Sequence, residues 1–371
     1  MKTISIVTTV LLLTLTSYGQ TLEQNFQRTI DSIYQKNPDA IGYILAIESP
    51  DRNISWTGAI GYSSIDSLQK LDPYQPVLIA SNIKTYISAT ILRLVEKDLI
   101  KLQQPIKKLI SPKTRKLFEL DGYLLDSIKV VHLLSHKSGI AYYHDDAYYQ
   151  FVSENPKYRW TRDEQLERTI REYDPLCKPG LCYNYSDANY LLLTEIIEKI
   201  SNLPFYTAMR ELLKYKKLGL DKTWQITLEK VPVNCKSLAH QYYKPMNMDS
   251  YDIDPSMDLY GGGGIACTMD DLAKFTSSLY NMKVVKNPAV FNLIFTKIET
   301  PDSTGNNYYL GIEEFYIGGM KGYGHGGAWG TFNFYIPELN TSIALCPLES
   351  TKRELNHDVI KRIISILKSK I

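Results

Sequence analysis

The sequence has few of the residues that most often hold structural metals. It contains five cysteines, and none of their spacings matches a zinc site. The six histidines are scattered, and no His-Glu-x-x-His motif occurs. A metal centre is therefore not expected.

The odd number of cysteines leaves at least one thiol without a partner within the chain. Cys177 and Cys182 are the nearest pair, and the turn-like segment Lys-Pro-Gly-Leu separates them. An exported protein can keep disulfides. A bridge between these two cysteines and a pair of free thiols are both compatible with the sequence.

The chain also lacks a strong imbalance of charge. Its formal net charge is +2 over 371 residues, which gives no reason to expect a nucleic-acid partner. Hydrophobic residues make up 44% and charged residues 22%, as in ordinary soluble globular proteins. The length allows one large or two medium domains.

No apolar run reaches the ~20 residues that a membrane-spanning helix needs. Lys2 precedes an apolar run of 13 residues at 4–16, and Ser17 and Gly19 place small residues around a cleavage point. This pattern predicts a signal peptide over 1–19 and a protein that is secreted or periplasmic. A retained membrane anchor is the alternative, and we expect no stable membrane span.

Periodicity places strands near both ends of the chain and helices in the middle. The simplest architecture is one sheet built from both termini with a large helical insertion, and an active site at the seam. We expect a single catalytic domain over 20–371, with a sheet part at about 20–80 and 255–371 and a helical part at about 81–254. The predicted helices are 22–36, 81–99, 128–140, 185–201 and 353–369, and the predicted strands are 41–49, 54–64, 323–337 and 341–348.

One short motif raises the possibility of nucleophilic catalysis. The spacing Ser-x-x-Lys occurs at Ser67/Lys70, Ser81/Lys84 and Ser365/Lys368. Ser81 begins a helical pattern, so Ser81 and Lys84 share one helix face and can touch. Lys84 could then take the serine proton. The alternative is a helix-capping serine beside a solvated lysine.

Two later segments favour the catalytic interpretation. Tyr185-Ser186-Asp187 follows Ser81 after 104 residues, and His325-Gly326-Gly327 follows Tyr185 after 140 residues. With these motifs in this order, the chain resembles the serine β-lactamase and penicillin-binding-protein superfamily, most closely its class C-like branch. The resemblance extends from about residue 25 to about residue 365. It implies an α/β (α+β) fold of the β-lactamase/transpeptidase type, with an antiparallel sheet flanked by helices and a mostly helical subdomain.

The resemblance also implies roles for individual residues. Ser81 would be the nucleophile that forms an acyl-enzyme, with Lys84 and Tyr185 sharing the proton transfers. The backbone N–H groups of Ser81 and Ala328 would form the oxyanion hole, and Gly327 would let substrate lie against its strand. The resemblance implies no cofactor, and it makes the histidines at positions 132 and 136 structural.

Two positions depart from the family pattern. Asp187 stands where the family has asparagine, and an ionised carboxylate only accepts hydrogen bonds. It could instead hold Lys84 by charge. His325 stands where many lactamases have lysine, so a permanent cation is replaced by a group charged only part of the time near neutral pH.

These departures leave the substrate open. The first expectation is a D-alanyl peptide carboxypeptidase or related peptidase, which takes a small-molecule or peptide substrate. A β-lactamase or a small-ester esterase is the next alternative. A non-catalytic relative that binds peptide or penicillin is the third, and Asp187 is the residue that keeps it open. Oligomeric state is not indicated by the sequence.

Overall fold

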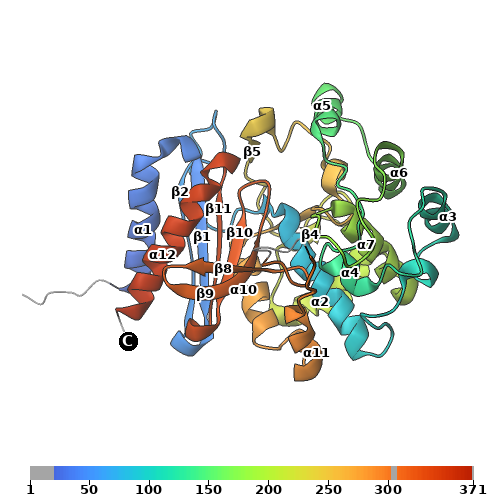
Figure 1. Cartoon of the computed structure of the whole chain (residues 1–371). Helices are drawn as coiled ribbons and strands as arrows, with labels where there is room; N and C mark the ends of the chain where they lie inside the picture. Colours follow the sequence, from blue (N-terminus) through green and yellow to red (C-terminus); the bar gives the residue numbers. More distant parts are fainter. Residues whose placement is uncertain (1–20, 302–306, 370–371) are drawn as a thin grey trace, which may run out of the picture.

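The computed structural model describes residues 21–301 and 307–369 (Figure 1). A sheet with covering helices forms one side of the molecule, and a group of helices forms the other. The predicted signal peptide lies outside the described residues. Within them, no helix combines the length and the apolar character that crossing a bilayer requires.

The main sheet is antiparallel and joins the two ends of the chain, as predicted. Its strand order is β2-β1-β11-β10-β9-β8. In the register of β1, Tyr43 lies opposite Ile60 on one side and Pro347 on the other. The strands are β1 (Gly42–Ser49), β2 (Ile54–Gly61), β8 (Glu313–Ile317), β9 (Met320–Gly326), β10 (Phe332–Ile336) and β11 (Thr341–Pro347).

Helices cover both faces of this sheet, which explains why β1 reads as a nearly continuous apolar run. Helices α1 (Leu22–Lys36) and α12 (Leu355–Lys368) lie on one face, and α10 (Met269–Tyr280) packs against the other (Figure 1). Successive β1 side chains alternate between the two cores. Leu45 belongs to the core under α1 and α12, whereas Ile44 and Ala46 belong to the larger core.

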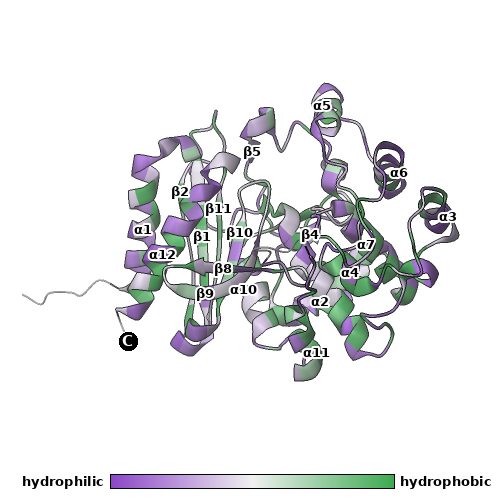
Figure 2. Cartoon of the chain, viewed as in Figure 1, coloured by the Kyte–Doolittle hydropathy of each residue, from purple (hydrophilic) through white to green (hydrophobic). Residues whose placement is uncertain are grey.

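The helical side of the molecule is built around α2 and α7, which contact one another. Both are buried over most of their surface, whereas the outlying α3 and α6 are largely hydrophilic (Figure 2). The remaining helices are α2 (Ile83–Glu96), α3 (Pro112–Leu120), α4 (Val130–Leu134), α5 (Asp146–Glu154), α6 (Arg162–Glu172), α7 (Asp187–Ser201), α8 (Phe205–Leu212), α9 (Tyr215–Leu218) and α11 (Pro288–Asn292).

Short strands lie between these two sides. Strands β3 (Val77–Leu78), β7 (Ile265–Cys267) and β4 (Thr223–Gln225) form a small sheet in that order, and β5 (Tyr242–Tyr243) pairs with β6 (Met248–Asp249). Strand β3 leads directly into the turn that carries Ser81. The small sheet therefore sets the position of the first predicted site residue.

Two predicted elements differ from the structure. The helix predicted over 128–140 is reduced to α4, because His136 and Gly139 both adopt positive φ angles and turn the chain. The single strand predicted over 323–337 is two strands, β9 and β10, joined by a turn. That turn contains Ala328, and Gly330 adopts a φ of 99° in it.

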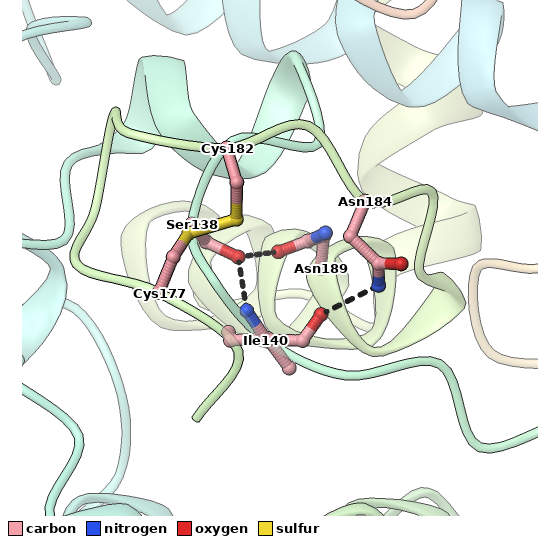
Figure 3. Close-up of a disulfide and its surroundings, with 6 residues drawn as sticks. All are labelled: Ser138, Ile140, Cys177, Cys182, Asn184 and Asn189. Atoms are coloured by element: carbon pink, nitrogen blue, oxygen red, sulfur yellow. Dashed lines mark hydrogen bonds between the residues drawn. A yellow bond between two sulfur atoms is a disulfide. The ribbon is translucent and has the colours of Figure 1, made fainter. Parts of the chain in front are cut away.

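A disulfide joins Cys177 and Cys182, one of the two alternatives that the sequence allowed (Figure 3). The bridged loop lies against the segment that follows α4. Gly139 can have no side chain here, because a Cβ atom would lie 2.1 Å from the Cys177 carbonyl oxygen. Beyond the bridge, the Asn184 amide nitrogen donates to the Ile140 carbonyl. The loop is thus fastened just before Tyr185.

Replacing Cys177 and Cys182 together by serine is expected to lower the free energy of unfolding by about 2 kcal/mol. It should also reduce kcat more than it changes KM, since the loop that precedes Tyr185 loses one of its attachments. Urea unfolding without reductant and steady-state kinetics measure the two effects. The free cysteine Cys235 offers a control, because Cys235→Ser breaks no bridge. Equal losses in both variants would contradict this interpretation.

Candidate active site

Ser81 lies in a short 3-10 turn, Ala80–Asn82, between β3 and α2. Ala80 has a φ of 44°, an unusual value for a residue with a side chain, so the turn is sharp. Ser81 is partly exposed, whereas Asn82 and Ile83 beside it are buried. The N-cap of α2 is Asn82, and no side chain caps this end of the helix. The helix-capping alternative for Ser81 is therefore wrong.

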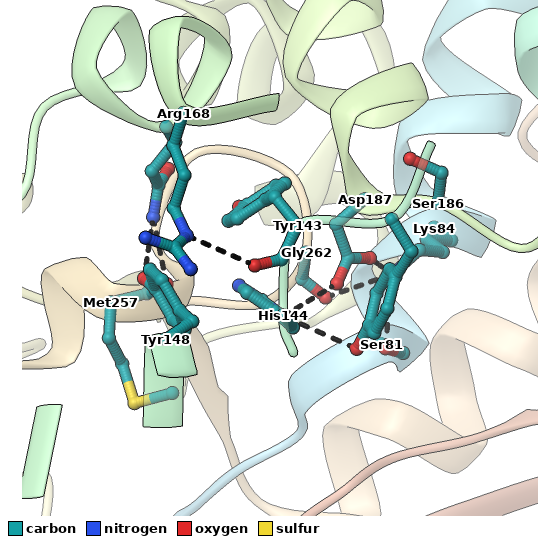
Figure 4. Close-up of polar contacts among 12 residues, drawn as sticks. Ser81, Lys84, Tyr143, His144, Tyr148, Arg168, Ser186, Asp187, Met257 and Gly262 are labelled. Atoms are coloured by element: carbon teal, nitrogen blue, oxygen red, sulfur yellow. Dashed lines mark hydrogen bonds and ion pairs between the residues drawn. The ribbon is translucent and has the colours of Figure 1, made fainter. Parts of the chain in front are cut away.

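Lys84 is fully buried and its ammonium group points at Ser81 (Figure 4). Its Nζ donates to Ser81 Oγ at 3.0 Å and to the Gly262 carbonyl at 3.2 Å. Nζ also lies 2.6 Å from Oδ1 of Asp187. A solvated lysine is thus excluded, and the predicted charge pairing between Lys84 and Asp187 is present in the structure.

Asp187 is the first residue of α7 and is buried between Lys84 and a histidine that the sequence analysis did not single out. His144 Nδ1 lies 3.1 Å from Asp187 Oδ2 (Figure 4). Burial alone would raise the pKa of the Asp187 carboxyl, but the Lys84 charge and the His144 contact outweigh it and hold that pKa well below its ordinary value. Asp187 is therefore a carboxylate at neutral pH.

Tyr185 lies over the same ammonium group. Lys84 Nζ is 4.9 Å from the centre of the Tyr185 ring. Burial, and next the Asp187 charge, raise the pKa of the Tyr185 hydroxyl well above its ordinary value, although a hydrogen bond with Ser81 opposes them. The resting form of Tyr185 is therefore the neutral phenol.

The His136 ring packs against the Tyr185 ring. Its ring centre lies 4.2 Å from that of Tyr185, and its Nδ1 accepts the Ser186 backbone N–H at 3.1 Å. Burial, followed by the Lys84 charge, lowers the pKa of His136 well below its ordinary value. Because α4 ends at Leu134, His136 lies outside this helix, and its contacts are with the Tyr185 ring and the Ser186 backbone.

His325 lies in β9 and differs from the sequence-based expectation. Its Nε2 lies 3.1 Å from the Tyr308 hydroxyl, and its Nδ1 lies 2.7 Å from the Gly326 carbonyl oxygen. Burial, and next the Lys84 charge, lower the pKa of His325 to about 3. The expectation of a group charged part of the time near neutral pH is therefore wrong, because burial keeps the imidazole neutral.

Gly327 follows β9 and lies close to the turn that carries Ser81. A Cβ atom on Gly327 would lie 2.2 Å from Thr331 Oγ1 and 2.5 Å from the Ile79 carbonyl oxygen, so a side chain has no space. Thr331 Oγ1 itself donates to the Ile79 carbonyl, and Asn82 Nδ2 donates to Thr331 Oγ1. These contacts tie the end of β9 to the Ser81 turn.

A small pocket opens at Ser81. Of the predicted site residues, Ser81, Asp187 and Ala328 line it, whereas Lys84, Tyr185, His325 and Gly327 do not. The rest of its lining comes from segments far apart in the sequence: Tyr142, His144, Tyr149, Tyr243, Met248, Ile253, Met257, Asp258 and Trp329.

Asp258 is a lining residue that the sequence did not indicate. Its buried Oδ1 has no hydrogen-bond partner among the described residues. Burial, and next the nearby Asp187 charge, raise the pKa of Asp258 to about 7. The glycine run 261–264 gives this carboxylate its space, since a Cβ on Gly262 would lie 1.9 Å from Asp258 Oδ1. The run leads into β7, and it was the signal in the sequence for a close approach at this point.

His144, Asp187 and Asp258 bring one nitrogen and two carboxylate oxygens within 4.8 Å of one another. Such donors can bind a metal ion. However, the Lys84 ammonium already lies 2.6 Å from Asp187, and it repels a second cation. The three residues are better described as a cluster centred on Asp187, which contacts both Lys84 and His144.

Asp258→Asn is expected to raise the free energy of unfolding at alkaline pH, because an amide of the same shape carries no charge to desolvate. A carboxyl group with a raised folded pKa loses stability as pH rises from its unfolded value, about 3.9, towards the folded value of about 7. The gain should be small near pH 4.5 and reach ~1–3 kcal/mol at pH 8. Urea unfolding at both pH values measures it, and an equal gain at both would contradict the assignment.

Comparison with known proteins identifies the family. The family model described as Beta-lactamase matches residues 31–359. The chain is 24% identical over 282 residues to the D-alanyl-D-alanine-carboxypeptidase/endopeptidase AmpH of Escherichia coli (strain K12), covering 71% of this chain and 68% of AmpH. It is 19% identical over 273 residues to Penicillin-binding protein 4* of Bacillus subtilis (strain 168), covering 70% and 57% of the two chains.

Solved structures show the same fold. The D-amino acid amidase from Ochrobactrum anthropi SV3, complexed with L-phenylalanine, superposes with a TM-score of 0.77 at 20% identity, covering 94% of this chain and 99% of the amidase. EstCE1, a hydrolase with promiscuous acyltransferase activity, superposes with a TM-score of 0.72 at 18% identity, covering 93% and 99%. The predicted fold class is confirmed.

Proposed function

Because the chain belongs to the Beta-lactamase family of serine hydrolases, we propose that it cleaves an amide or ester through an acyl-enzyme on Ser81. The observation that carries the proposal is the contact between Ser81 Oγ and the buried ammonium group of Lys84 at 3.0 Å. A serine that serves only structure does not need a fully buried lysine directed at its hydroxyl.

In the proposed mechanism, Ser81 Oγ attacks the substrate carbonyl and its proton passes to the Lys84–Tyr185 pair. In the resting form Lys84 donates to Ser81 and Tyr185 is a neutral phenol. The pair must therefore lose one proton before it can accept the one from serine. The two groups act as a coupled unit, and the rate should rise with pH until that proton has left.

The remaining steps use the other predicted residues. The N–H groups of Ser81 and Ala328 would stabilise the oxyanion, and both residues line the pocket. Tyr185 would protonate the leaving group and then orient the water that hydrolyses the acyl-enzyme. Asp187 would hold the Lys84 ammonium in place rather than donate to a substrate carbonyl, as an asparagine could.

The comparisons and the site favour different leaving groups. Similarity to AmpH supports the first expectation, a D-alanyl peptide carboxypeptidase. The neutral His325 supplies no positive charge for a carboxylate at the end of a leaving group. This favours an amidase-like or esterase-like reaction, as in the D-amino acid amidase and EstCE1, over a carboxypeptidase or a β-lactamase.

We also propose that residues 1–19 direct export and that residues 20–371 form one catalytic domain in a secreted or periplasmic protein. Both parts of this proposal come from the sequence pattern described above. Fractionation of cells that produce the full chain, followed by N-terminal sequencing of the exported form, tests it. A mature protein that still begins at Met1 would contradict it.

A substrate panel tests the catalytic proposal. Residues 20–371 would be incubated with a D-Ala-D-Ala peptide, a D-amino acid amide, a p-nitrophenyl ester, a chromogenic cephalosporin and a fluorescent penicillin. We expect turnover of the amide and the ester. A stable covalent adduct with no turnover of any compound would support the non-catalytic alternative instead.

A further inference from the structure

Two carboxyl groups, those of Asp187 and Asp258, line the Ser81 pocket. Of its two carboxylates, Asp187 is paired with Lys84 at 2.6 Å, whereas Oδ1 of Asp258 has no partner among the described residues. Within the described lining there is no lysine or arginine that could neutralise it. A buried carboxylate oxygen without a partner lowers stability, so the presence of this one beside the proposed nucleophile suggests that a ligand supplies the missing contact.

The walls of the pocket suit a cation as well. Tyr142, Tyr149, Tyr243 and Trp329 all line it. The ring centres of Tyr149 and Tyr243 lie 6.0 Å apart, and those of Tyr243 and Trp329 lie 6.0 Å apart, so the three rings form a continuous wall. Aromatic faces attract ammonium groups through their quadrupole. A carboxylate beside an aromatic wall is therefore a good receptor for a charged amine.

We propose that Asp258 binds the ammonium group of the substrate's acyl part, so that the substrates are amides or esters of amino acids with a free amino group. This proposal rests on the proposed acyl-enzyme function and names its substrate class. It assigns Asp258 as the residue that determines specificity. The neutral His325 is consistent with this substrate class, because an amino-acid amide or ester has no carboxylate that would need a cation in the site.

The groups that face Asp258 set its charge. Asp187 raises its pKa, whereas His144 and Lys84 lower it, and burial is the largest cause of the rise to about 7. An ammonium group in the pocket favours the ionised form of Asp258. The substrate must be protonated while Asp258 is ionised, so kcat/KM for an amino substrate should fall at low pH and again as its amine loses its proton.

Two compounds of similar shape test the proposal. D-Phenylalanine p-nitroanilide carries the ammonium group, and its N-acetyl derivative does not. We expect kcat/KM to be roughly 10- to 100-fold higher for the free amine, because a hydrogen bond to a charged group contributes that much. Equal or faster cleavage of the N-acetyl compound would overturn the substrate class.

Asp258→Asn should reduce this preference to a few-fold or less. The exposed Asp252→Asn is the matched control and should keep the full preference. An unchanged preference in Asp258→Asn would overturn the role of this residue. The ratio of the two substrates cancels any general effect of the substitution on the catalytic groups.

A binding measurement separates this proposal from the proposed catalytic function. Calorimetric titration of Ser81→Ala with D-phenylalanine amide and with its N-acetyl derivative needs no turnover. We expect the free amine to bind roughly 10-fold more tightly or better, and to lose that advantage in Ser81→Ala/Asp258→Asn. Charge-dependent binding by a protein that cleaves no compound would overturn the catalytic function alone. Cleavage with no dependence on charge would overturn only the ammonium site.

Discussion

Ser81→Ala is expected to lower kcat/KM by roughly 10³-fold or more for every substrate that the protein turns over. In the proposed mechanism the acyl-enzyme forms on the serine oxygen, and Lys84 and Tyr185 would have no hydroxyl to activate without it. Because Ser81 is partly exposed and caps no helix, the alanine variant should keep its stability within ~1 kcal/mol. Steady-state kinetics with the p-nitrophenyl ester, and mass spectrometry of the acylated protein, measure the loss of activity and of the adduct.

The chain contains its own control for this experiment. Ser365 also begins a Ser-x-x-Lys motif, but it is exposed on α12, and Lys368 beside it is exposed too. Ser365→Ala should leave both the kinetics and the adduct unchanged. Turnover or adduct formation that persists in Ser81→Ala would show that another residue is the nucleophile.

Asp187→Asn is expected to lower the free energy of unfolding by about 3–5 kcal/mol, because it leaves the fully buried Lys84 ammonium without its partner. The family asparagine should therefore not be tolerated as a single change in this chain. The double variant Lys84→Met/Asp187→Asn removes both charges and should recover most of the stability while remaining inactive. Urea unfolding of the wild type, both single variants and the double variant measures the coupling.

An exposed ion pair gives the matched control. Lys113 and Asp163 are also 2.6 Å apart, but both side chains are more than half exposed. Asp163→Asn should cost no more than about 1 kcal/mol, because water and salt screen such pairs. Similar losses for Asp187→Asn and Asp163→Asn, or additive effects in the double variant, would contradict a buried and coupled pair at the site.

Local spacing predicted that Ser81 and Lys84 could touch, whereas the choice of Ser81 among three Ser-x-x-Lys motifs, and of Tyr185, came from the family resemblance. Ser81 and Lys84 touch because a helical turn brings residues three apart onto one face, and Tyr185 and Asp187 flank the start of a strongly apolar helix. The apolar runs near both ends predicted the central strands. Apolar runs do not show where the chain turns. The helix at α4 was therefore predicted too long, and β9 and β10 were predicted as one strand.

The rest of the site depends on long-range packing. His144 and Asp258 come from segments without a periodic pattern, and only the folded chain places them beside Asp187. The charge state of His325 was mispredicted for a similar reason. A sequence shows that histidine can titrate near neutral pH, but the burial that keeps it neutral comes from the surrounding fold.

The position of β1 between β2 and β11 has a consequence for biogenesis. Tyr43 pairs with Pro347, so an early strand has to wait for one of the last segments of the chain before its second edge is covered. Such distant pairing makes folding slow, and a chain still being synthesised lacks both β11 and the turn with Ala328. The proposed nucleophile, Ser81, is thus synthesised long before Ala328, which would complete the proposed oxyanion hole, and a partly synthesised or truncated chain should have no hydrolytic activity.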